Sequence, residues 1–157
     1  DTILDTYVRI VLSEAAVWHA KYLDARATSY RPTVRARLRA GRDFTATEYL
    51  GAHEACEAFR DAIDEALDGL DALILPTLPI LAPTLGDAEL VIDGAAVPIR
   101  AAMLRNTQLF NMTGHPAISL PMQMPAGTLP AGLQLVGRLG DTATLLAIAA
   151  TCEKIVC

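Results

Sequence analysis

The last third of the chain alternates turn residues with short apolar runs, and this pattern limits the fold more than any other stretch. Residues 106–121 read NTQLFNMTGHPAISLP, so a turn at Gly114 precedes a short apolar strand that Pro121 stops. After a short loop, residues 129–137 read LPAGLQLVG, which predicts a second strand bracketed by glycines. Its one polar residue is Gln134. The segment therefore predicts two short strands, each bounded by strand-breaking residues.

Length and composition favour one globular domain. A chain of 157 residues that is 52% hydrophobic can bury a full-sized core. Its net charge of −5 argues against nucleic acid or an anionic membrane as partner. The least charged stretch, residues 72–85, contains three prolines, which a transmembrane helix would hardly carry.

The two ends of the chain and its cysteines bear on where the protein works. The first residues lack the basic and apolar regions of a signal peptide. The absence of an initial Met is consistent with a start inside a longer protein. Three cysteines without a CxxC motif indicate a reducing compartment, so we expect a cytoplasmic protein in which Cys56 and Cys152 are buried thiols.

The first seventy residues read as helices. Between Ile3 and Ala25, apolar residues recur at steps of three and four, which predicts one buried stripe: Leu4, Val8, Val11, Ala15, Trp18 and Tyr22. Residues 30–32 break this helix, and the five arginines of residues 31–42 favour a solvated face over a phosphate site. Thr45 to Glu48 resembles a capping box. The helix that begins there is expected to end near Gly69. Its inward-facing residues are expected to be Tyr49, Ala52, Cys56, Phe59, Ile63 and Leu67.

Strands and further helices follow. Residues 71–75 predict a buried strand, and residues 89–92 and 95–99 predict a hairpin around a type I′ turn at Asp93–Gly94. A helix is expected over residues 100–110. Asp141 or Thr142 caps a final helix, which is expected to carry on one side Leu145, Leu146, Ala149, Cys152 and Ile155. Strands separated by helices indicate an α/β fold.

The residues alone show no complete active site. The three histidines lie far apart and form no metal-binding motif, and we expect His19 and His53 to be core or boundary residues. His115, in a turn between Gly114 and Pro116, is constrained in geometry and could face solvent or a functional cleft. Ser119 lies in the apolar strand without a glycine elbow and favours a structural role. We therefore expect no metal, no cofactor and no catalytic residue in this chain.

Four segments in register resemble the C-terminal part of an amidase-signature hydrolase. They are DALILPTLP at residues 71–79, NMTGHPAISLP at 111–121, LPAGLQLVG at 129–137 and the final helix with Leu145 and Leu146. The similarity extends loosely back to the Glu14 helix and residues 30–35. It implies a layered α/β/α fold with a mixed sheet, of which residues 1–157 form a C-terminal segment. The segment would comprise a helical part, 1–70, and a part with strands, hairpin and terminal helix, 71–157.

The resemblance also implies a chemistry. Such hydrolases cleave a carboxamide C–N bond with a Ser–Ser–Lys triad, whose lysine and Gly/Ser-rich signature lie in the N-terminal and central parts of the family. This sequence contains neither, so we expect the chain to be inactive alone and to partner the N-terminal catalytic portion around a small amide substrate.

The same resemblance places Thr107, Phe110 and Asn111 along the acyl-side cavity, although Asn111 is slightly favoured as a helix cap. Thr77 would approach the cleft or only shape its loop. Gln134 is favoured as a loop partner over a substrate contact, and Gly114, Gly132 and Gly137 are expected to supply special backbone conformations.

An alternative is a non-catalytic binding or scaffold module that retains this fold. Either way, the face that would pack on the missing portion is apolar, so we also expect self-association, with a homo-oligomer as one form.

Overall fold

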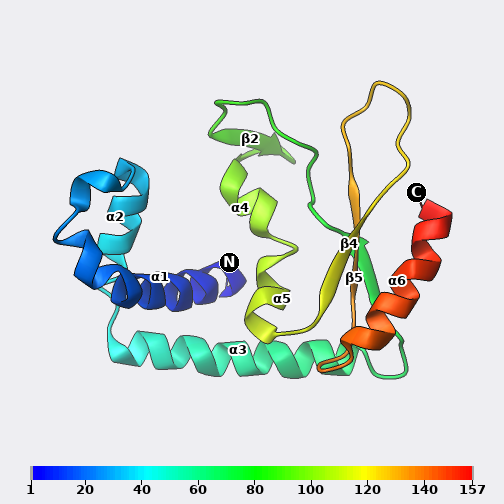
Figure 1. Cartoon of the computed structure of the whole chain (residues 1–157), viewed down its shortest axis with the longest axis horizontal. Helices are drawn as coiled ribbons and strands as arrows, with labels where there is room; N and C mark the ends of the chain where they lie inside the picture. The colour runs from blue at the N-terminus through cyan, green and yellow to red at the C-terminus, as the bar shows by residue number, and fades with distance from the viewer. Residues whose placement is uncertain (1, 157) are drawn as a thin grey trace. The chain divides into compact units, whose positions relative to one another are not determined.

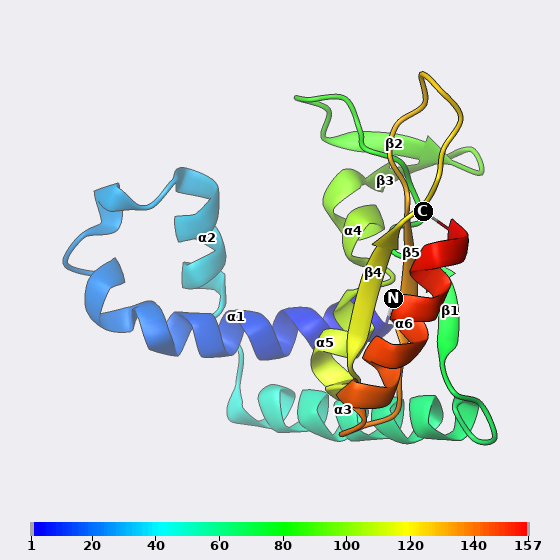
Figure 2. The same ribbon diagram turned by 45° about the vertical axis from the view of Figure 1, so that its right-hand side comes forward.

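The computed structural model describes residues 2–156, which divide into two compact units at residues 58 and 59. Figures 1 and 2 show their helices and strands. The first unit contains α1 (Thr2–Leu23), the 3-10 helix η1 (Ala27–Ser29), α2 (Pro32–Ala40) and the first part of α3 (Ala46–Ala66). The break expected at residues 30–32 is confirmed, with Pro32 in the first turn of α2, where its missing N–H costs nothing.

The stripe expected on the first helix is wrong in its detail. The residues of α1 that are buried are Thr6, Ile10, Ala16 and Leu23, whereas Trp18 and Tyr22 are 71% and 42% exposed. Apolar residues occur on nearly every side of this helix, so their spacing does not single out one face. Tertiary contacts select the buried face instead.

The capping box at the start of α3 is confirmed. The Thr45 backbone N–H donates to Glu48 Oε2 at 2.8 Å, and the Glu48 N–H donates to Thr45 Oγ1 at 3.2 Å. The hydrogen bond from Thr45 holds the pKa of Glu48 below its ordinary value. Of the residues expected to point inward, Ala52, Cys56 and Leu67 are buried, and the others are half-buried.

The second unit is built on a three-stranded sheet, and both strands expected in the last third are confirmed. The sheet has the order β1 (Leu73–Pro76), β5 (Gly132–Val136), β4 (Ala117–Pro121). Both pairs are antiparallel, and Gln134 lies opposite Leu75 on one side and Ser119 on the other. A mixed sheet contains both parallel and antiparallel neighbouring strands, and residues 2–156 show only antiparallel neighbours in this sheet. Its strands β1 and β4 run in the same direction, but β5 lies between them, so they do not pair.

Helices cover both faces of this sheet, so the expected α/β/α layering is confirmed (Figures 1 and 2). On one face, α6 (Thr142–Val156) packs through Leu145 and Ala149 against Leu120 and Leu135. On the other face, the junction of α4 (Ile99–Leu104) and α5 (Gln108–Thr113) is held by Gln134, whose Nε2 donates to the carbonyl of Asn106 at 3.0 Å. The expectation that Gln134 bonds a loop is therefore confirmed.

The single helix expected over residues 100–110 is wrong, because the chain forms α4 and α5 with a break between them. The sheet binds the chain at this break. Asn106 donates its side-chain amide to the carbonyl of Pro76 at 2.9 Å, while its own carbonyl accepts from Gln134. These contacts with β1 and β5 fix the position of the segment between the two helices.

Two smaller expectations, a hairpin and a buried strand, have different outcomes. The hairpin is confirmed as β2 (Glu89–Ile92) and β3 (Ala95–Pro98), and Asp93 and Gly94 both have positive φ, as a type I′ turn requires. The strand at 71–75 is only half-buried, since it lies at the sheet edge and leaves Ile74 64% exposed.

The final helix is confirmed with Asp141 as its cap, because Asp141 Oδ1 accepts from the N–H of Thr144 at 3.3 Å. Leu145 and Ala149 are buried as expected, but Leu146 and Ile155 are 51% and 79% exposed. The apolar surface of α6 is therefore wider than the part that the sheet covers.

Candidate functional site

A hollow of about 470 Å³ opens beside one end of the sheet in the second unit. It lies where β1 continues into the proline-rich connection, and its walls come from residues 76–83, Met103, Ser119, Met122 and 130–132. Cavities that bind small molecules commonly have volumes of roughly 300–1,000 Å³ and predominantly apolar walls. The hollow fits both criteria.

Two hydroxyl groups provide the polar part of this wall. Thr77 Oγ1 lies 2.6 Å from Ser119 Oγ, and either group can be the donor. The strands set this distance: the Thr77 N–H donates to the carbonyl of Gly132 at 2.8 Å, and Ser119 lies in β4, on the opposite side of β5. Both Thr77 and Ser119 line the hollow, and the expectation that Thr77 approaches the substrate cleft stays a prediction.

Gly132 leaves the space that the two hydroxyls occupy. A Cβ at this position would lie 2.7 Å from both Thr77 Oγ1 and Ser119 Oγ. The two hydroxyls can keep these positions only beside a residue without a Cβ, and the expectation of a special backbone conformation here is wrong. At Gly114 that expectation is confirmed, since φ is +79° at the end of α5.

The three residues expected to line the substrate cavity share one helix but differ in exposure. Thr107 precedes α5 and is half-buried, Phe110 is buried, and Asn111 is exposed. None of them lines the hollow. Asn111 is also not the helix cap, because α5 continues to Thr113 and ends at Gly114, whose N–H bonds the carbonyl of Phe110. Their role in substrate binding stays a prediction.

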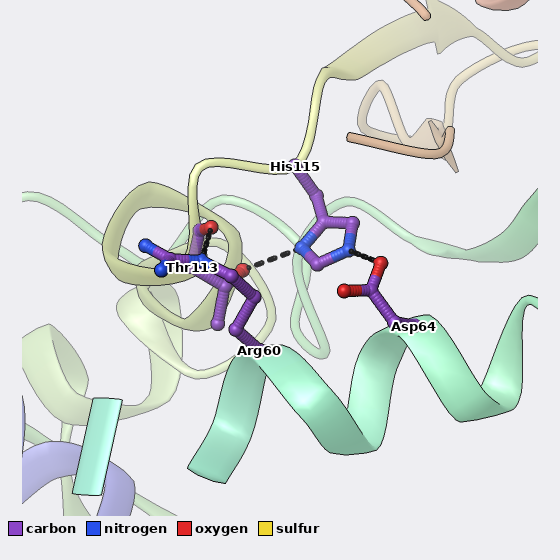
Figure 3. Close-up of polar contacts among 4 residues, drawn as sticks. All are labelled: Arg60, Asp64, Thr113 and His115. Carbon is purple, nitrogen blue, oxygen red and sulfur yellow. Dashed lines mark hydrogen bonds and ion pairs between the residues drawn. The ribbon is translucent and has the colours of Figure 1, made fainter. Parts of the chain in front are cut away.

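A buried histidine forms a second polar cluster, which the sequence did not reveal (Figure 3). His115 Nδ1 lies 2.9 Å from Thr113 Oγ1, and His115 Nε2 lies 3.1 Å from Asp64 Oδ1. Arg60 Nε donates to the carbonyl of Thr113 at 2.9 Å. The cluster therefore ties the end of α3 to the turn between α5 and β4.

The order carboxylate, imidazole, hydroxyl resembles a nucleophilic triad, but burial rules out that use. The side chain of His115 has no exposed surface, and Thr113 is fully buried, so its hydroxyl is closed to a substrate. The alternative that His115 faces solvent is wrong. The cluster is a structural connection.

The described residues hold no group of three or more His, Cys, Asp or Glu side chains that could bind a metal ion. None of the helices between residues 2 and 156 combines the length and apolar character that crossing a membrane requires.

Sequence comparisons match the chain to a known family. The family model described as Amidase matches residues 1–146. A putative amidase, AmiD, of Mycobacterium tuberculosis is 34% identical over 128 residues, which cover 82% of this chain and 26% of AmiD. An amidase of Pseudomonas putida is 34% identical over 149 residues, which cover 92% of this chain and 31% of that enzyme.

A structural comparison agrees. A crystal structure of an amidase superposes on 99% of this chain with a TM-score of 0.92 at 35% identity, and the match covers 36% of that protein. The chain thus spans between a quarter and somewhat more than a third of the length of these relatives. From the extent of the family match, this chain belongs to the amidase family.

Proposed function

We propose that this chain is the C-terminal region of an amidase, where it forms core and one wall of the substrate pocket, while other parts of the enzyme cleave the C–N bond. The observation that carries this proposal is that, among residues 2–156, no base lines the hollow at Thr77 and Ser119, while the hydroxyl–imidazole pair described above, Thr113 and His115, is buried. Ser119 is bonded to Thr77, and His115 to Thr113 and Asp64. Hydrolysis through a hydroxyl needs a base beside that hydroxyl.

The hollow at Thr77 and Ser119 supports the role of a pocket wall, because it combines apolar walls with a small polar patch. The proposal extends this wall along α5. Asn111, which is exposed, would offer its amide to the substrate, and Phe110, which is buried, would support the helix from behind. The hydroxyl of Thr107 donates to the carbonyl of Leu104 at 3.3 Å, so Thr107 would hold the turn between α4 and α5 in place.

The partner in this proposal is the N-terminal catalytic portion of the same enzyme. Several large apolar side chains are exposed, among them Val17, Trp18, Ile74 and Ile155. Within the described residues, the outer edges of β1 and β4 also carry no further strand. Both features fit surfaces that another part of an enzyme covers, and both favour self-association when the chain is alone.

Purified residues 1–157 are expected to release no ammonia from carboxamides above the rate in buffer. The measurement is ammonia formation from a panel of aliphatic and aromatic primary amides, with circular dichroism as the check that the chain is folded. Saturable release above the rate in buffer would show that the chain carries its own catalytic groups and would overturn the proposal. Loss of that release in the variant Ser119→Ala would identify Ser119 as one of these groups.

A further inference from the structure

A second hollow, of about 450 Å³, lies within the first unit and shares no residue with the hollow at Thr77 and Ser119. Its walls come from α1 and from the first turn of α3 with the two residues before that turn. A space of this volume suits a small molecule. The proposed function assigns no ligand to it.

Aromatic rings form a large share of these walls. The chain has one Trp, four Tyr and three Phe residues, and three of these eight line the hollow: Trp18, Phe44 and Tyr49. Trp18 is 71% exposed, so its ring is not used to fill the core. The face of an aromatic ring attracts a cation, and Trp does so most strongly. The rings therefore favour a positively charged ligand.

The charge of the walls points the same way. Among the described residues that line the hollow, Glu14 is the charged one. Tyr49 donates its hydroxyl to Glu14 Oε1 at 3.0 Å, and this bond raises the pKa of Tyr49, which stays neutral at physiological pH. A carboxylate can accept several hydrogen bonds, so the one from Tyr49 leaves room for a further partner.

The two kinds of wall together narrow the ligand class. A phosphate or carboxylate ligand would meet the like charge of Glu14, and a neutral ligand would not use that charge. An inorganic cation is strongly hydrated and gains little from apolar walls. An alkylated ammonium ion matches both features, because its alkyl groups suit Val17 and the rings while its charge suits the carboxylate.

We propose that this hollow binds a small organic ammonium ion, with Trp18, Phe44 and Tyr49 against its alkyl groups and Glu14 balancing its charge. The inference goes beyond the proposed function and involves no cleavage step. Val17 and Trp18 also belong to the exposed apolar side chains that the proposed function leaves to another part of the enzyme. Such cover would keep water from the bound ion, and cation–π attraction is stronger where the cation is desolvated.

Trp18 supplies a direct probe, because it is the one tryptophan of the chain and it lines the hollow. The full chain is titrated with choline chloride, and sodium chloride at equal ionic strength gives the baseline. A saturable change in tryptophan fluorescence is expected with choline. Neohexyl alcohol, in which carbon replaces the charged nitrogen of choline, should bind about tenfold more weakly.

Three substitutions test the walls. Glu14→Gln keeps the size of the side chain and is expected to weaken choline binding about threefold to fivefold, while binding of neohexyl alcohol stays the same. Phe44→Leu removes a ring but keeps an apolar wall, so it should weaken choline more than the alcohol. Glu54→Gln is the matched control: it removes the same charge from an exposed position of α3 outside the hollow, so choline binding should not change.

Three results would overturn the inference. No saturable change with choline beyond that in sodium chloride would show that the hollow does not bind the ion. Equal or tighter binding of neohexyl alcohol would show an apolar hollow without preference for charge. Equal weakening by Glu14→Gln and Glu54→Gln would show an effect of net charge alone. None of these results depends on amide cleavage, so the inference and the proposed function fail separately.

Discussion

Replacing Gly41 with alanine is expected to destabilise the protein by about 3 kcal/mol or more, since overpacking beside fixed backbone has few ways to relax. A Cβ at Gly41 would overlap the carbonyl oxygen of Leu12 in α1 and would lie 2.7 Å from the carbonyl carbon. The obstacle is helix backbone, which cannot rotate away as a side chain can. The turn after α2 would therefore have to leave α1. Urea unfolding, monitored by circular dichroism, measures the change in the free energy of unfolding.

Gly51→Ala is the matched control for this experiment. It lies in α3 with no atom within 4 Å of its added Cβ, so the same change should stabilise the protein by about 0.5–1 kcal/mol through helix propensity. Equal effects of the two changes would mean that the packing of α2 against α1 is not as close as described.

His115→Ala is expected to cost about 2–4 kcal/mol, because it empties a buried site and leaves the Thr113 hydroxyl without its imidazole partner. Amide hydrogen exchange should quicken in α5 and in the end of α3, the two segments that the imidazole joins. Thermal unfolding and exchange measured on the same sample give both effects.

Two milder variants check that the effect belongs to the buried ring. His19→Ala removes a half-buried histidine with one bond, to Tyr30 at 2.9 Å, and should cost less. Asp64→Asn removes only the charge of a side chain that is 48% exposed, so its effect should stay below about 1 kcal/mol. A loss for Asp64→Asn as large as that for His115→Ala would show that the contact with Asp64, not the packing of the ring, holds the segments together.

Local signals in the sequence predicted much of the fold. Thr45 and Glu48 are three residues apart, and Asp93 and Gly94 are adjacent. The helix cap and the hairpin turn that they form therefore each depend on residues close together in the sequence. The strands at 117–121 and 132–136 were equally clear, since turn residues bound both. Such features depend on a few consecutive residues, which is why they can be predicted without the tertiary structure.

The candidate site depended on contacts between distant residues, and sequence patterns do not record these. Thr77 meets Ser119 across 42 residues, and Asp64 meets His115 across 51. The break between α4 and α5, which the sequence did not predict, also lies at a long-range contact, since Gln134 in a strand binds the carbonyl of Asn106. One signal in the sequence does point to the site: the glycine at position 132, at the start of a short apolar strand, is typical of a close approach by another group.

The most direct test of the proposed function is ammonia release by a hybrid enzyme. In the hybrid, this chain replaces the matched region of the Pseudomonas putida amidase, and the hybrid is compared with residues 1–157 alone and with the parent enzyme. The account predicts saturable hydrolysis of a neutral carboxamide by the hybrid and none by the chain alone. A folded hybrid with no hydrolysis beside an active parent would contradict it, and would favour a module that keeps the fold without contributing to the chemistry.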